Sequence, residues 1–319
     1  MQLKQFGIIM GAALVLLLSS CAKKTDTTNT VTVDGNSKQH NEDVQNTKTE
    51  SDNVNTDING ALSGISGFGK NGAVGALYSI CGATIDSSHA SGSQPYIDIH
   101  FDGITNCSGR IRSGDIRVQL ISGAHWSSVG AMLQVTHTNY KVTFPGLNNH
   151  SLTFNGVKYL TDVSGIDWIG VYFGTKTVSI RERSYNTTVT FDNGNVSSWN
   201  SFRLSTWGIS NGTTNPQYYA IVNGDTTIDG KVIDSYGKTR FNTDFITEMV
   251  QPWKSGTACG WWRPTAGIYT SRTDRFTITA TFGTDASGTQ VTSGCAYGFK
   301  LNWALDSGSV TGERVLAYW

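Results

Sequence analysis

Alternating hydrophobic and polar residues are the dominant pattern of this chain from about residue 78 onward. Apolar side chains occupy every second position over 97–101 and again over 116–120. The same period of two returns over 276–282 and 297–303. A period of two places successive side chains on opposite faces of a strand, so each segment predicts a β-strand with one buried face.

Turn-forming dipeptides separate these segments. Asn-Gly occurs six times and Asp-Gly three times, and both favour the positive φ angles of hairpin turns. The chain contains 36 glycines and only 5 prolines, which favours strands joined by tight turns over helices. We therefore expect an all-β fold, an antiparallel meander or sandwich of a dozen or more strands. It occupies residues 58–319 as one β domain or two β subdomains.

The first 20 residues predict a signal peptide. An apolar run from Phe6 to Leu18 follows Lys4, and it is too short to cross a bilayer, which requires about 20 residues. The run ends in Leu18-Ser19-Ser20-Cys21, which resembles the lipobox of bacterial lipoproteins. This resemblance implies that Cys21 is lipidated and anchors the protein to the outer membrane, on its periplasmic or its cell-surface side.

Residues 21–57 predict a flexible linker after the lipidated cysteine. They consist mainly of Thr, Asn, Asp, Lys, Gln and Ser with scattered valines. Such a segment cannot bury enough apolar surface to offset the entropy lost on ordering. The following stretch, 58–80, is rich in Gly and Ala and has irregular apolar spacing, which fits neither a helix nor a strand.

Four cysteines remain once Cys21 is assigned to a lipid. An even number in an oxidising compartment predicts two disulfides. We favour Cys81 with Cys107 and Cys259 with Cys295, because each pair flanks neighbouring strand segments and closes a moderate loop; the other two connectivities stay open. Metal binding is the competing interpretation, but no Cys-x-x-Cys or Cys-x-x-His spacing occurs.

Charge is balanced, with 24 basic and 24 acidic side chains. No basic stripe is present to neutralise many phosphates, so nucleic acid is not expected as a partner. We expect no cofactor, and no catalytic motif stands out.

Asp98, His100 and Asp102 project from one face of the strand predicted around 97–101. A divalent metal could accept two of them, although a solvated polar strand face is the simpler interpretation. Asp98 and Asp102 are also the only clustered candidates for an Asp-based hydrolase.

Trp199, Arg203 and Trp207 also fall in phase along one strand, opposite Phe202 and Leu204. Two indoles flanking a guanidinium on a polar face resemble a stacking platform for sugar rings or flat ligands. The alternative is that a second sheet or a loop covers this face and the tryptophans belong to the core.

A second group of aromatic residues lies beside Cys259. It consists of Trp253, Trp261, Trp262 and Tyr269. Packing around the predicted disulfide is the simplest role for these rings.

Short glycine-rich signatures occur at 81–84, 97–101, 107–116, 259–262, Gly267 and 282–283. They resemble the signatures of uncharacterised lipoproteins of Bacteroidota. The resemblance implies a secreted, anchored β domain and brings no activity or site with it. Lys23 and Lys24 stand where those lipoproteins often carry acidic residues that favour surface export, which leaves the side of the membrane open.

Together these features predict a membrane-anchored, non-catalytic, extracytoplasmic β lipoprotein. It would bind a glycan through Trp199, Arg203 and Trp207, or play a structural role beside another envelope protein. The alternative is an envelope hydrolase with an Asp-based active site.

Overall fold

The computed structural model describes residues 35–69, 79–147, 149–210, 217–260, 263–305 and 311–318. In chain order its elements are α1 (Gly35–Ser63), β1 (Ala83–Asp86), β2 (Tyr96–Cys107), β3 (Arg110–Ser122), β4 (Met132–Phe144), the 3-10 helix η1 (Pro145–Leu147), β5 (His150–Asp162), α2 (Trp168–Tyr172), β6 (Val178–Phe191), β7 (Val196–Ser210), β8 (Gln217–Gly224), β9 (Thr226–Ile228), β10 (Lys231–Lys238), β11 (Asp244–Gly256), β12 (Ala266–Thr273), β13 (Phe276–Thr284), β14 (Gly298–Leu305) and β15 (Thr311–Ala317). Within these ranges, neither helix combines the length and the hydropathy that spanning a bilayer requires.

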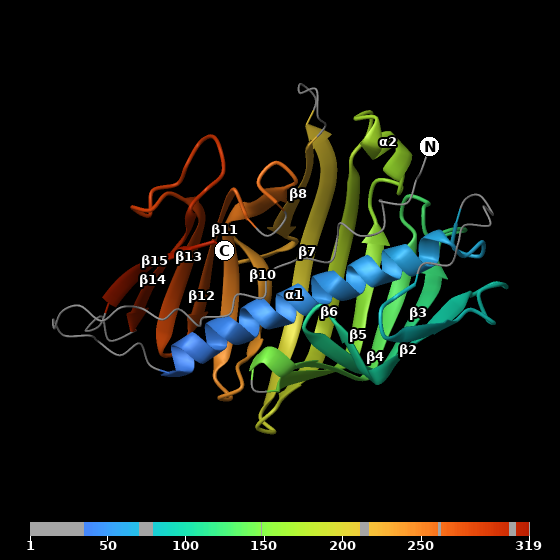
Figure 1. Ribbon diagram of the computed structural model, residues 1–319, viewed down its shortest axis with the longest axis horizontal. Coiled ribbons are helices and arrows are strands. Elements are labelled where there is room, and N and C mark those ends of the chain that lie inside the picture. The colour runs from blue at the N-terminus through green and yellow to red at the C-terminus, as the bar shows by residue number, and fades with distance from the viewer. Residues whose placement is uncertain are drawn as a thin grey trace.

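All fifteen strands belong to one antiparallel sheet (Figure 1). Strands β1 to β7 pair in chain order, and β10 to β15 continue the same sheet in chain order. The expected all-β class with a dozen or more strands is therefore confirmed, and its topology is largely a meander. The sandwich alternative is wrong for the described strands, because none of them forms a second sheet.

One position in the sheet, between β7 and β11, is shared by two strands. β10 pairs with β7 over 198–201, and β8 pairs with β7 over 203–210. β11 repeats this division, since it pairs with β10 over 244–248 and with β8 over 253–256. β8 and β10 thus occupy opposite ends of a single strand position.

Helix α1 lies across one face of the sheet and crosses its strands from β12 toward β3 (Figure 1). Near its start His40 contacts Ser271 of β12, and near its end Asp57 pairs with Arg112 of β3. No described side chain between residues 39 and 62 is exposed. The helix is therefore an integral layer of the fold.

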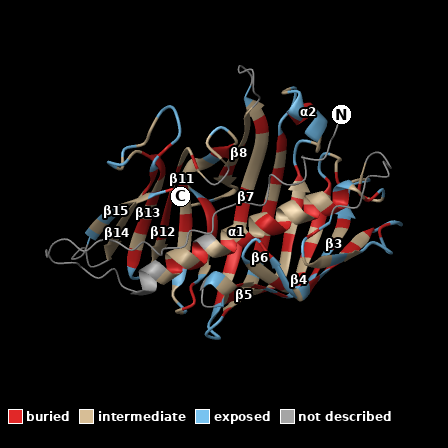
Figure 2. Cartoon of the chain, in the orientation of Figure 1, coloured by how far each residue is buried: buried red, intermediate tan, exposed pale blue. Residues whose placement is uncertain are grey.

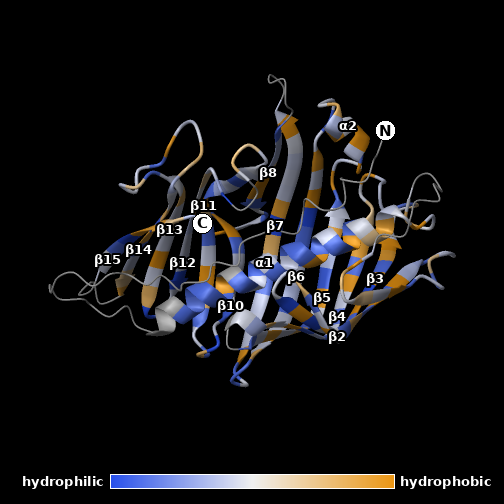
Figure 3. Cartoon of the chain, viewed as in Figure 1, coloured by the Kyte–Doolittle hydropathy of each residue, from blue (hydrophilic) through white to orange (hydrophobic). Residues whose placement is uncertain are grey.

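The linker predicted over 21–57 is wrong from residue 35 onward, because α1 begins there. Most of α1 is hydrophilic (Figure 3), and its buried polar groups have partners on the strands. Asp43, for example, makes two hydrogen bonds of 2.6 and 2.7 Å to Arg240. Paired charges can be buried where unpaired ones cannot, so a polar segment became an ordered helix. Cys21 and the predicted signal peptide lie outside the described residues.

Small hydroxyl side chains line up across five strands beneath α1. Residues in direct register on neighbouring strands point to the same face. The registers align Ser184, Ser201, Ser235, Thr247 and Ser271, which we call the small-residue row. Because these side chains are short, the row allows α1 to lie close to the sheet.

Buried apolar residues form two clusters on this continuous sheet, and the strands show the expected alternation of buried and less buried positions (Figure 2). The larger cluster joins Val54, Ile58 and Leu62 of α1 to strands β2–β7 and to Phe245. The smaller one is centred on β11–β14 and includes Phe282. The prediction left open whether the strands form one β domain or two subdomains. The structure has features of both, because one hydrogen-bonded sheet carries two apolar cores.

Both favoured disulfides are present. Cys81 is bonded to Cys107, and Cys259 is bonded to Cys295. The first joins the segment before β1 to the end of β2, and the second joins the loop after β11 to the loop before β14. Each apolar cluster therefore lies in a part of the sheet that carries one covalent bridge.

Candidate functional site

The three weakly predicted metal ligands lie on β2, but each has its own partner. Asp98 accepts two hydrogen bonds of 2.8 Å from Arg117. His100 contacts Asp115 at 2.6 Å. Asp102 accepts backbone N–H groups two and three residues further on, both at 2.9 Å. Nowhere in the described ranges do three His, Cys, Asp or Glu side chains gather to hold a metal ion, so the predicted metal site is wrong.

Trp199, Arg203 and Trp207 share one face of β7 as expected, but α1 covers that face. Trp199 is 4 % exposed, and its ring centroid lies 4.6 Å from that of Phe245 in the core. Arg203 is 5 % exposed and binds both carboxylate oxygens of Asp52 on α1, at 2.7 and 3.2 Å. The open stacking platform is therefore wrong, and of the three residues Trp207 alone lines a cavity rich in indoles.

That cavity has a volume of about 120 Å³, and we call it the tryptophan cavity. Strand register builds its floor, because paired residues share a face and residues two apart on a strand return to it. One row across the sheet is Ile180, Ser205, Val222 and Trp253. The next row is Trp207, Ala220 and Ser255. Both rows exist because β8 fills the gap between β7 and β11 at this end of the sheet.

The two helices supply the walls of the tryptophan cavity. Helix α1 contributes four polar side chains from two successive helical turns, namely Asp52, Asn55, Thr56 and Asn59. Helix α2 contributes Trp168, whose ring lies 6.1 Å from that of Trp207 and nearly perpendicular to it. Because Trp168 is 40 % exposed, this wall borders the solvent.

The position of Trp168 depends on its own short helix. Asp167 caps α2 by accepting a hydrogen bond of 2.8 Å from the backbone N–H of Gly170. A capping carboxylate satisfies one of the free N–H groups at a helix start. The cap thus fixes the turn that aims Trp168 at the cavity.

This arrangement is suited to holding one ring. An apolar cavity of about 150 Å³ binds benzene in an engineered protein, so a volume of about 120 Å³ matches a single six-membered ring. Indole faces provide apolar contact, while the amides, hydroxyls and carboxylates of α1 and the sheet provide donors and acceptors. The site therefore fits a ring that carries polar substituents.

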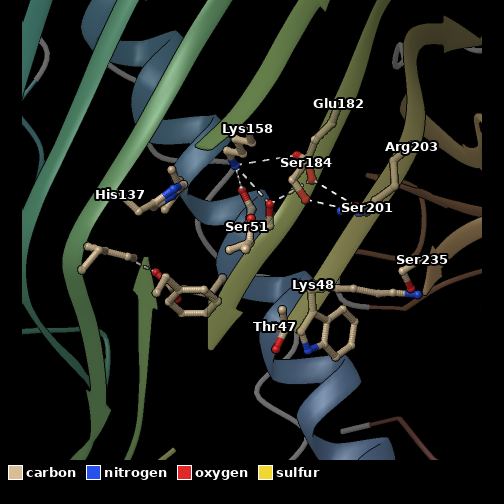
Figure 4. A pocket seen from close by; sticks show the side chains of 16 residues that line it. Thr47, Lys48, Ser51, His137, Lys158, Glu182, Ser184, Ser201, Arg203 and Ser235 are labelled. Atoms are coloured by element: carbon tan, nitrogen blue, oxygen red, sulfur yellow. Dashed lines mark hydrogen bonds and ion pairs between the residues drawn. The ribbon is translucent and has the colours of Figure 1, made fainter. Parts of the chain in front are cut away.

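A second, smaller cavity lies on another side of α1 and is lined by charged residues (Figure 4). Lys158 of β5 donates hydrogen bonds to Ser51 Oγ at 3.0 Å and to Asn55 Oδ1 at 2.6 Å. Its Nζ lies 3.7 Å from Glu182 Oε2. Glu182 also accepts hydrogen bonds from Ser51 at 3.1 Å and Asn55 at 2.5 Å. We call this the charged cavity.

The charges around this cavity are fixed by their neighbours. Burial alone would raise the pKa of Glu182, but Lys158 and Arg203 outweigh burial and lower that pKa to about 2. Burial, with a smaller contribution from Lys158, lowers the pKa of His137 to about 3. At neutral pH Glu182 is therefore ionised and His137 is uncharged.

The charged cavity is too small for an organic ligand, at about 50 Å³. Four buried atoms of its lining have no hydrogen-bond partner among the described protein atoms, namely Thr47 Oγ1, His137 Nδ1, Arg203 Nε and Ser235 Oγ. Its size and polar lining match a site for one or two water molecules. Of the two cavities, the tryptophan cavity is therefore the one with room for an organic ring.

Sequence reasoning missed two of the three indoles in the tryptophan cavity. Trp168 was not singled out, although Asp167 before it is a helix-start signal. The sequence predicts that Trp253 packs around the second disulfide, whereas in the structure it lines the cavity, because β11 pairs with β8. Trp261 and Trp262 lie outside the described residues.

No protein-family model matches this chain, and neither the curated proteins nor the solved structures contain a significant match to it.

Proposed function

We propose that this protein is a lipid-anchored binding protein of the cell envelope, and that its tryptophan cavity takes one sugar ring of a glycan. The observation that carries the proposal is the convergence of Trp168, Trp207 and Trp253 from three separate elements on one cavity. Indole rings offer flat apolar surface to the apolar faces of a sugar. The polar side chains of α1 already have partners within the protein, and their remaining lone pairs and amide N–H groups offer hydrogen bonds to the sugar's hydroxyl groups.

Two carboxylates border the cavity, and their surroundings favour binding over hydrolysis. Glycoside hydrolysis needs one carboxyl group that is protonated and acts as general acid. The pKa of Glu182 is lowered to about 2, so this group is ionised. Asp52 has both oxygens bound to Arg203. Both carboxylates are thus engaged in holding α1 to the sheet.

The membrane anchor in this proposal is supported by the lipobox resemblance at Cys21. A lipoprotein with a ligand cavity and two disulfides is suited to an oxidising compartment. Glycans of the envelope or its surroundings would be within its reach.

The test is a glycan-array screen with the full-length protein in detergent, followed by calorimetric titration of any glycan that binds. We expect binding that falls at least tenfold in Trp168→Ala and in Trp253→Ala. Trp303→Ala is the matched control, because Trp303 lies on β14 and lines neither described cavity. Thermal unfolding of each variant verifies that it is folded.

Two results would overturn the proposal. One is a folded wild-type protein that binds no glycan on the array. The other is binding that Trp168→Ala and Trp253→Ala leave unchanged, which would place the glycan elsewhere on the molecule.

A further inference from the structure

Large apolar side chains are exposed together at one end of the sheet, around α2. Ile169 is 72 % exposed and Phe173 is 69 % exposed. The neighbouring apolar residues that are also exposed are Val129, Val163, Trp168 and Tyr172. We call these six residues the α2 tip. Figure 2 shows α2 as an exposed segment.

Two loops contribute to the α2 tip, and they are in contact. The backbone N–H of Gly130 donates to the carbonyl of Asp162 at 2.8 Å, and the N–H of Asp162 donates to Ala131 at 3.0 Å. A Cβ atom at Gly165 would lie 3.2 Å from a methyl group of Val129. The tip is therefore one surface built from the β3–β4 and β5–β6 connections.

The acidic groups near the α2 tip are turned inward or neutralised. Asp162 is 0 % exposed and accepts three backbone N–H groups of the loop that follows it. Asp167 caps α2 and forms an ion pair with Lys176 at 3.0 Å. The side chain of Lys176 is 58 % exposed. The tip thus presents apolar and aromatic groups beside one ion pair, with no unpaired carboxylate in the segment 162–177.

This composition is typical of segments that lie in the interface of a bilayer. Trp and Tyr are enriched where lipid meets water, and an apolar face can be buried at the boundary between head groups and acyl chains. An exposed apolar patch on a monomer marks an interaction surface.

The length of the chain before α1 keeps the domain close to the membrane. Thirteen residues separate Cys21 from Gly35, where α1 begins. A chain of thirteen residues spans at most about 45 Å. The domain has a similar length along its strands, since the 13-residue strand β5 is about 43 Å long. A lipid at Cys21 would therefore hold the domain within about its own length of the bilayer.

We propose that the α2 tip inserts into the lipid–water interface of the membrane that carries the anchor. The inference rests on the lipid anchor at Cys21. It shares Trp168 with the tryptophan cavity, but Ile169 and Phe173 do not line that cavity. Insertion of Ile169 and Phe173 to the depth usual for interfacial segments, about 5–10 Å, would fix the orientation of the sheet relative to the membrane.

The test uses the full-length protein in vesicles of phosphatidylethanolamine and phosphatidylglycerol. Ile169→Cys is labelled with a polarity-sensitive fluorophore, and Phe173→Cys serves as a second position. Val196→Cys is the matched control, because this valine is 52 % exposed and begins β7 at the opposite end of the strand from α2. We expect blue-shifted emission and several-fold quenching by brominated lipid at 169 and 173, and neither effect at 196.

Two outcomes overturn the proposal. One is water-like emission at both 169 and 173 that matches the emission at 196. The other is a blue shift that disappears as the protein is diluted with excess lipid, because that dependence would mean that a second copy of the chain covers the tip. Neither outcome bears on the glycan array, which is read in detergent.

Discussion

At the scale of single residues, Glu182 is the carboxylate that balances two buried cations. Lys158 and Arg203 sit on the strands to either side of it, and the side chains of all three are no more than about a tenth exposed. Burial lowers the pKa of Lys158, while Glu182 acts against that shift. The charged state of Lys158 therefore depends on its anionic neighbour.

We predict that Glu182→Leu lowers the free energy of unfolding by about 3–5 kcal/mol, because the variant leaves buried Lys158 without its carboxylate. Urea unfolding followed by circular dichroism measures the change. The double variant Lys158→Met with Glu182→Leu should recover most of the loss, since it removes both charges together.

A matched surface pair provides the control for this prediction. Lys238 and Asp244 pair at 2.9 Å with side chains 48 % and 83 % exposed. Asp244→Leu should cost less than about 1 kcal/mol. A loss of the same size in Glu182→Leu would contradict the buried-charge argument and would mean that water reaches Lys158.

Arg203 and its neighbours on β7 show what a strand pattern can and cannot predict about single residues. Alternation correctly predicted that Trp199, Arg203 and Trp207 share one face of β7. It could not predict that face's exposure, because a period of two reports which residues point the same way and nothing about what lies above them. The partner of Arg203 is Asp52, 151 residues away in sequence.

At the scale of elements, α1 is the part of the fold that the sequence pattern missed. Val54, Ile58 and Leu62 are spaced four residues apart, as on one face of a helix. From residue 35 to residue 53, however, Val44 is the only aliphatic side chain larger than a methyl group. The face turned to the sheet there is made of polar residues such as His40, Asp43 and Glu50, which are 1–2 % exposed.

A polar buried face cannot be recognised from hydropathy, because its stability comes from distant partners. Glu50 binds Arg110 of β3, and Asp43 binds Arg240, which follows β10. Without those strands the same segment has the composition of a solvated linker. The strands β2, β3, β13 and β14 were predictable, because 97–101, 116–120, 276–282 and 297–303 each carry their own alternation. Turn dipeptides such as Asn193-Gly194, between β6 and β7, predicted where strands end.

We predict that Ser235→Leu displaces α1 from the sheet. Ser235 is 0 % exposed in the small-residue row and lies with Lys48 of α1 around the charged cavity. A larger side chain there forces the helix outward, at a cost of about 1–3 kcal/mol. Limited proteolysis should then cut within 35–63 faster than in the wild type, with the β-sheet signal in circular dichroism unchanged.

Ser210→Leu is the control for this prediction. It makes the same substitution on β7 at an exposed position, away from α1. Cleavage in α1 at the same rate for Ser235→Leu, Ser210→Leu and the wild type would show that the helix does not need the small-residue row.

At the scale of the whole molecule, one open sheet carries two apolar cores. Alternation along a strand indicates a buried face but not the layer that buries it, so a sandwich and a meander were equally consistent with the sequence. The larger core is closed by α1, while the smaller one, around β11–β14, is formed by the sheet and its loops. Backbone pairing is continuous between them, but side-chain packing is not. Regions with separate cores can open with different free energies.

We predict that each disulfide stabilises the core nearest to it. Cys259 and Cys295 are 36 residues apart in sequence, and Cys81 and Cys107 are 26 apart. Closing loops of these lengths is worth about 3–4 kcal/mol each. In Cys259→Ala with Cys295→Ala, amide hydrogen exchange should accelerate in β12–β15 and stay slow in β3–β6. In Cys81→Ala with Cys107→Ala, amide hydrogen exchange should accelerate in β1–β3 and stay slow in β12–β14.

The two variants are controls for each other, since each removes one bridge and leaves the other intact. Equal acceleration of hydrogen exchange over all strands in both variants would contradict this prediction. It would mean that the continuous sheet unfolds as one cooperative unit, because backbone pairing, and not the division of the core, determines the cooperativity of unfolding.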